Sequence, residues 1–139
     1  TGEGAYSEAE PLVDESLAIR RKMLGGEHPK VGSALNVKAN LLLATHRYEE
    51  ARQAATEAGR ILALSLPADH WQLAMAKNLE GAALVGLHDY KGAELLLLGS
   101  QEGLSNAALP GVAKAGRARL ADLYTALGNP VEASKYKNN

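Results

Sequence analysis

Three tyrosines recur at one fixed interval along this 139-residue chain, and the interval constrains the fold more than any other feature. Tyr6, Tyr48 and Tyr90 are 42 residues apart, and each begins a four-residue string that ends in alanine: Tyr-Ser-Glu-Ala, Tyr-Glu-Glu-Ala and Tyr-Lys-Gly-Ala. Self-similarity at a period of about 20–50 residues is typical of stacked-repeat proteins, whose units bury their apolar faces against neighbouring units. The spacing therefore predicts an array of structural repeats.

Histidines repeat with the same register. His28 and His70 stand 20 residues before the second and third tyrosines, each next to residues typical of a loop, and His46 and His88 stand two residues before the same tyrosines. The two pairs lie at the starts of different units and in successive turns, so neither pair shares one helix face at the spacing of metal ligands. Turn or helix-capping roles are favoured over a metal site, and we expect no metal and no other cofactor.

The composition is that of a globular helical protein. Hydrophobic residues make up 46% of the chain, cysteine and phenylalanine are absent, and a core must be built from leucine, alanine, valine and isoleucine. A formal net charge of −1 gives no general attraction to nucleic acid or to an anionic membrane, so neither is expected as a partner. No stretch has the length of a membrane span, and the N-terminus has no signal-peptide pattern. These features predict a soluble, cytoplasmic protein.

The periodicity of apolar residues predicts an all-α fold of about seven antiparallel helices in one domain, 1–139. Residues 6–24 form the second helix of a first unit, 29–66 a second unit, 69–104 a third, and 111–139 a truncated fourth. Gly25 and Gly26 end the first helix, Pro29 begins the next, and Asp69 is expected to cap the start of the third unit. The chain is either an excerpt from a longer array or an array with unusual ends.

Burial can also be predicted for individual helices. The helix that starts at Pro29 has two apolar flanks, one of which includes Val37, and such a helix is expected to pack between neighbours. The helix that starts at Tyr90 has four leucines in a row, 95–98, and is expected to be buried nearly all round. Since the outermost helices lack a pair-mate or are short, we expect exposed apolar flanks, and with them either association between copies through the ends or marginal stability in isolation.

The repeated positions resemble tetratricopeptide repeats. Each helix pair has a small residue in its first helix, a turn position that usually holds glycine, and then the tyrosine-to-alanine string. The small residues are Ala39, Gly81 and Ala121, and the turn positions are His46, His88 and Gly128. The 42-residue period exceeds the usual length of about 34. Together with the segment Leu-Gly-Gly-Glu-His-Pro at 24–29, it looks like the kinesin light chain type of repeat, which also occurs in bacterial signalling proteins.

This resemblance implies a right-handed superhelix of helix pairs, whose first helices line a concave groove for a peptide or a partner protein. It also implies that the chain is part of a larger protein, as in bacterial proteins where such modules are joined to a kinase or a nucleotide-switch domain. It implies no catalytic activity. The sequence agrees, because it has no nucleophile motif, no phosphate-binding glycine loop and no pair of carboxylates at catalytic spacing.

Polar residues recur on the face of the first helices that is least apolar. Asparagine is a poor helix former, so its repetition there needs a reason, and its amide can both donate to and accept from the backbone of an extended peptide. The alternative is that these amides bond to neighbouring helices or to water. Ser33 and Met75 lie on the same face as the asparagines, and Arg119 could add a basic side chain at the rim of the groove. The predicted peptide-binding residues are therefore Asn36, Asn40, Asn78, Ser33, Met75 and Arg119.

The sequence therefore predicts a non-catalytic module that binds a protein or peptide in a concave groove. The alternative is a structural segment that mediates self-assembly, or a spacer that positions an attached catalytic domain such as a kinase. A groove lined by polar and basic side chains favours the first, whereas a smooth alanine-lined groove favours the second.

Overall fold

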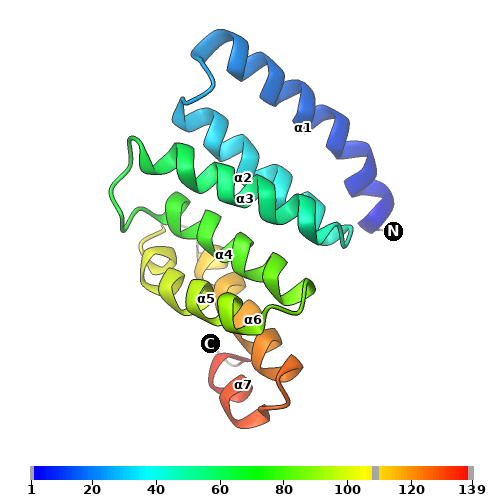
Figure 1. Ribbon diagram of the computed structural model, residues 1–139, viewed down its shortest axis with the longest axis vertical. Coiled ribbons are helices and arrows are strands. Elements are labelled where there is room, and N and C mark those ends of the chain that lie inside the picture. Colours follow the sequence, from blue (N-terminus) through cyan, green and yellow to red (C-terminus); the bar gives the residue numbers. More distant parts are fainter. Residues whose placement is uncertain (1, 108–109, 138–139) are drawn as a thin grey trace.

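The computed structural model describes residues 2–107 and 110–137, and over these ranges the chain forms helices and no strands (Figure 1). The predicted all-α fold is confirmed. The seven helices of the described ranges are α1 (Gly2–Leu24), α2 (Pro29–Ala44), α3 (Tyr48–Ala63), α4 (Trp71–Gly86), α5 (Tyr90–Ser105), α6 (Pro110–Ala126) and α7 (Pro130–Lys137).

Histidine side chains begin two of the helices. The Nδ1 atom of His28 accepts a hydrogen bond from the backbone N–H of Lys30 at the start of α2, and His70 Nδ1 accepts one from Gln72 at the start of α4, both at 3.1 Å. These bonds satisfy N–H groups that have no partner within the helix. The capping role predicted for histidine is confirmed here, whereas the prediction that Asp69 is the cap is wrong by one residue.

The other two histidines close the turns within helix pairs. His46 and His88 have φ angles of +60° and +65°, in the left-handed region, and Gly128 has +72° at the corresponding turn. In each case the next N–H reaches back to a carbonyl five residues earlier, for example Arg47 N to Leu42 O at 2.8 Å. This is the Schellman closure of a helix C-terminus, which normally favours glycine. Each histidine also bonds through Nδ1 to the hydroxyl of the recurrent tyrosine, at 2.7 Å for Tyr48.

The helices form two layers that stack from α1 at one end to α7 at the other (Figure 1). Each helix packs against the next in sequence, and in addition α2 packs against α4 and α4 against α6. The first helices of the pairs, α2, α4 and α6, therefore form the inner layer. In the described part of the chain no such contact joins α1, α3, α5 and α7 to one another, so these form the outer layer.

The core lies between consecutive units. Leu62 of α3 is completely buried in a cluster with residues from α1, α2 and α4, namely Leu17, Val31, Ala34, Leu35, Leu73 and Ala76. A Cβ on Gly32 would lie only 2.7 Å from Leu62 Cγ, so α2 and α3 approach closely at this point because Gly32 has no side chain. Small and large residues thus fit together across the helix pair.

Two burial predictions are wrong. Of the four consecutive leucines in α5, Leu97 is buried but Leu95 and Leu98 are 72% and 43% exposed. Because α5 is an outer helix, it packs only against α4 and α6 and presents its remaining face to solvent. Val37, predicted to lie on a packing flank of α2, is 54% exposed on the inner layer.

Candidate functional site

A pocket of about 480 Å³ opens between the three inner helices. Each of α2, α4 and α6 contributes one turn or more of its exposed side to the wall. The lining residues are Ser33, Asn36, Val37, Asn40, Trp71, Gln72, Met75, Leu79, Gly111, Val112, Ala115 and Arg119. The volume falls within the range of about 300–1,000 Å³ that is usual for binding pockets. We call this pocket the inner groove.

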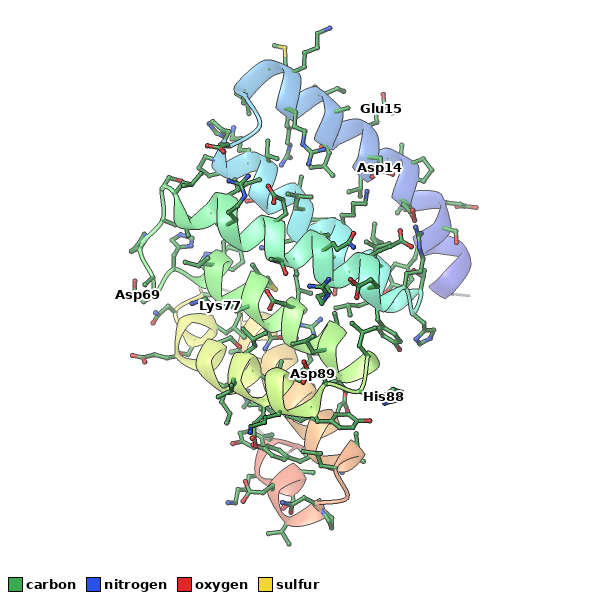
Figure 2. All side chains as sticks on the ribbon, viewed as in Figure 1. Asp14, Glu15, Asp69, Lys77, His88 and Asp89 are labelled. Carbon is green, nitrogen blue, oxygen red and sulfur yellow. The ribbon has the colours of Figure 1, made fainter. Side chains whose placement is uncertain are left out.

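The structure brings five of the six predicted site residues to the inner groove: Ser33, Asn36, Asn40, Met75 and Arg119. They come from all three inner helices. Arg119 is the basic residue that lines the groove. Lys38, also on α2, pairs with Asp14 of α1 at 2.7 Å, and in Figure 2 Asp14 lies on the side of α1 toward α2.

Asn78 does not face the inner groove. Its side chain is completely buried, where Nδ2 donates to Ser100 Oγ at 3.0 Å and Oδ1 accepts from Arg119 at 2.8 Å. The reason is that α5 and α6 cover this position, and a Cβ on Gly116 of α6 would lie 3.6 Å from the Asn78 amide. For Asn78, the alternative of bonding to neighbouring helices is therefore the correct interpretation.

Asn36 is one period before Asn78 but is bonded differently. Its Nδ2 donates to the backbone carbonyl of Gln72 at 3.1 Å and so ties α2 to α4. Its Oδ1 is buried, and within residues 2–107 and 110–137 it accepts no hydrogen bond. A buried acceptor left without a donor costs about 1–3 kcal/mol, and Asn36 lines the inner groove.

Arg119 places a positive charge in the groove wall. Its guanidinium donates to the amide oxygens of Asn78 and of Asn40, the latter at 3.2 Å. Among the described residues, no carboxylate forms an ion pair with it. Burial lowers the pKa of Arg119, and the charge of Asp122 partly opposes this change. The hydrogen-bond partners of this charge are thus two neutral amides.

The rest of the groove is mainly apolar. Val37 of α2, Trp71 and Met75 of α4 and Val112 of α6 contribute side chains, and Gln72 Nε2 donates to Ser33 Oγ at 2.9 Å along one wall. Sequence reasoning missed Val37, Trp71, Gln72 and Val112. Trp71 could have been noticed from the sequence, because it is the one tryptophan of the chain and directly follows His70, one of the repeated histidines.

Neither a metal-binding cluster nor a membrane-spanning helix is found in the described residues. Within 2–107 and 110–137, no group of three or more histidine, aspartate or glutamate side chains could hold a metal ion. In the same part of the chain, no helix has both the length and the apolar character to cross a membrane.

The repeats can now be compared with known proteins. Residues 2–63 match the tetratricopeptide repeat family model, and the helix pairs of the described structure continue the same arrangement beyond that segment. Residues 2–63 therefore belong to the tetratricopeptide repeat family. No curated protein sequence matches it.

Solved structures agree with this fold. Two crystal structures of nearly identical TPR-like repeats, from a Podosopora anserina protein assigned as a kinesin light chain, superpose with a TM-score of 0.75 at 24% sequence identity. One of the two is a single-substitution variant of the other. The match covers 96% of this chain and 64% of each of those chains. This chain thus spans less than two thirds of the proteins that it resembles.

The different bonding of the repeated asparagines gives a prediction for stability. Asn78→Ala removes an acceptor for Arg119 and a donor to Ser100 inside the protein, so we expect the free energy of unfolding to fall by about 1–3 kcal/mol. Asn40→Ala, at an exposed position, should change it by less than about 0.5 kcal/mol. Urea denaturation followed by circular dichroism measures both. Equal effects would contradict the assignment of Asn78 to the core.

Proposed function

We propose that this chain is a non-catalytic protein-interaction module that binds an extended peptide segment of a partner protein in the inner groove. Tetratricopeptide repeats generally mediate protein–protein interaction. The observation that carries the proposal is Arg119, a charged side chain in the groove wall whose described partners are two neutral amides. A partly buried charge whose hydrogen-bond partners are neutral amides is only partly compensated, so an anionic ligand group would be bound preferentially.

The other groove features define the complementary ligand. Trp71, Met75 and Val112 form an apolar surface for one or two apolar side chains, and the amide of the exposed Asn40 can bond to a peptide backbone. Side-chain amides beside an extended backbone satisfy groups that would otherwise be unpaired. We therefore expect the ligand to carry an acidic side chain or a terminal carboxylate close to an apolar residue.

The spacer alternative receives less support from the groove. A spacer requires no ligand surface, and a smooth wall of alanines would serve it. The wall instead contains a tryptophan, a methionine and an arginine. The groove is consistent with a module that binds, whether or not a catalytic domain is attached to the same polypeptide.

Selection from a library of random displayed peptides tests the proposal. Selected peptides should be enriched in aspartate or glutamate next to an apolar residue, and titrating one of them should change the fluorescence of Trp71, the one tryptophan of the chain. The matched control is Trp71→Phe, which should abolish this signal while calorimetry still detects binding. Failure to select any peptide, or selection without acidic enrichment, would contradict the proposed ligand.

A further inference from the structure

The outer helix α5 presents two leucines to solvent. Leu95 and Leu98 are 72% and 43% exposed. Lys91 and Glu102, which are also exposed, continue the same row at its two ends. Steps of four, three and four residues keep these side chains on one side of the helix, opposite the buried Ser100. We call the row of four, Lys91, Leu95, Leu98 and Glu102, the outer stripe.

Neighbouring repeats do not cover this side of an outer helix. One period earlier, at the same positions of α3, all four residues are polar and exposed, namely Glu49, Gln53, Thr56 and Arg60. The outer layer continues on either side of α3, with α1 before it and α5 after it, and these positions still face solvent. The outer stripe therefore faces away from the stack, and its two leucines are a feature of α5 that the repeat does not require.

The charges of the outer stripe are available to a second helix. Lys91 lies in the first turn of α5 and Glu102 in the last turns. In the part of the chain that the structure describes, neither forms an ion pair. In α3, by contrast, the equivalent Arg60 pairs with Glu57 of its own helix. A base at one end and an acid at the other make the outer stripe complementary to itself when a second α5 lies antiparallel.

We propose that α5 is a dimerisation surface that packs antiparallel against α5 of a second copy of this chain. A two-fold axis midway between residues 95 and 98 is also midway between residues 91 and 102, so one axis serves both pairs. Leu95 then packs beside Leu98 of the second copy, and Lys91 lies beside Glu102 of the second copy, each contact occurring twice. A parallel pair would place like charges together, so the charges select the antiparallel orientation.

Gly99 supports the close approach of a second helix. Glycine inside a helix lowers its stability relative to other residues, so its presence there needs a reason. Among the described residues, no atom lies within 4 Å of a Cβ built at Gly99, so packing inside the chain does not provide one. Gly99 follows Leu95 by one turn, and in the antiparallel pair it lies opposite Leu95 of the second copy. The missing side chain leaves room for that leucine.

The dimer leaves the inner groove open. The residues that line the groove come from α2, α4 and α6, whereas α5 belongs to the other layer. Two grooves on one assembly would bind a partner that has two copies of a motif more tightly than a single groove does, because the second site is present at a high effective concentration. This consequence rests on the proposed function, whereas dimerisation itself does not.

Sedimentation equilibrium of the whole chain tests the contribution of the leucines. The chain should associate reversibly and weakly, because the outer stripe is short. Replacing Leu95 by Gln together with Leu98 by Thr gives α5 the residues of α3, and should lower the association constant at least about tenfold. Leu64→Gln, at a position 57% exposed near the end of α3, is the matched control and should change it by less than about twofold. Circular dichroism checks that the fold is intact.

Charge variants test the antiparallel register. Lys91→Glu and Glu102→Lys should each weaken the dimer at least about fivefold at low salt, because each places like charges side by side twice. Mixing the two variants should restore association. In the mixed dimer, one copy has acid at both ends of the outer stripe and the other has base at both ends, so both pairs attract.

Gly99→Gln tests the close approach of the helices. Glutamine is the better helix former, so the thermal midpoint of the dilute chain should rise. The same side chain should weaken the dimer at least about threefold, because it fills the space for Leu95 of the second copy. Damage to the fold would not give these opposite changes, and a dimer that is unaffected or tighter would contradict the proposed contact.

Three sedimentation results would overturn the proposal. A chain that is monomeric at every concentration would leave the outer stripe to a helix of another protein. Association that survives the replacement of both leucines would take place through another surface. A mixture of the two charge variants that associates no better than either alone would exclude the antiparallel register. None of these results depends on whether the groove binds peptide, so the two proposals fail independently.

Discussion

Replacing Leu62 by alanine is expected to lower the free energy of unfolding by about 2–5 kcal/mol. Leu62 is completely buried where α1, α2, α3 and α4 meet, so truncation leaves a cavity that no single helix can fill by moving. Chemical denaturation monitored by circular dichroism measures the change. Leu64→Ala, at a position 57% exposed, is the matched control and should change stability by less than about 0.5 kcal/mol.

A double-mutant cycle with Gly32 tests the reason for that loss. Gly32→Ala alone should be destabilising, because the new Cβ would lie 2.7 Å from Leu62 Cγ. In the Leu62→Ala background the same methyl group enters the cavity, so the double variant should be more stable than the sum of the single losses predicts. If the two losses of stability simply add, Gly32 and Leu62 do not pack against each other as closely as the structure shows.

Arg119→Gln is expected to weaken binding of a selected acidic peptide roughly 10- to 150-fold, corresponding to about 1.5–3 kcal/mol for a hydrogen bond to a charged group. Glutamine keeps a polar side chain of similar shape at the groove wall but removes the charge. Arg21→Gln, on the exposed surface of α1, removes a charge outside the groove and should leave the affinity unchanged within about twofold. Calorimetric titration measures both.

The salt dependence separates local recognition from general attraction. A partly buried charge is screened less than exposed ones, so raising the salt concentration should reduce the affinity only modestly. If the two arginine variants lose affinity equally, or if high salt abolishes binding, the acidic group is attracted by the surface as a whole and Arg119 has no specific role.

The sequence predicts the repeat register more completely than any other feature of the fold. The interval between Tyr6, Tyr48 and Tyr90 predicts the helix pairs and their order, because identical units must bury equivalent faces. The inner position of α2, α4 and α6 was implied by the resemblance to tetratricopeptide repeats. Helix ends follow from local chemistry in the same way, except that His70 takes the capping position expected for Asp69.

Periodicity is less informative about which equivalent residues face solvent. Asn36 and Asn78 occupy the same repeat position and both are buried, yet Asn36 borders the groove and Asn78 does not, because the cover depends on the unit that follows. Likewise Leu95 and Leu98 look like core residues by type but lie on the outer layer. Hydrophobicity gives the tendency to be buried, and the neighbouring helices decide the outcome.

The most direct test of peptide binding in the inner groove is to block the groove. The chain has no cysteine, so Val37→Cys, 54% exposed on the groove wall, can be labelled selectively with a bulky maleimide, and Leu64→Cys, 57% exposed and outside the groove, is the matched control. Labelling at position 37 should abolish binding of a selected peptide, whereas labelling at position 64 should leave its affinity unchanged. Undiminished binding after labelling at position 37 would place the ligand elsewhere and contradict the proposed function.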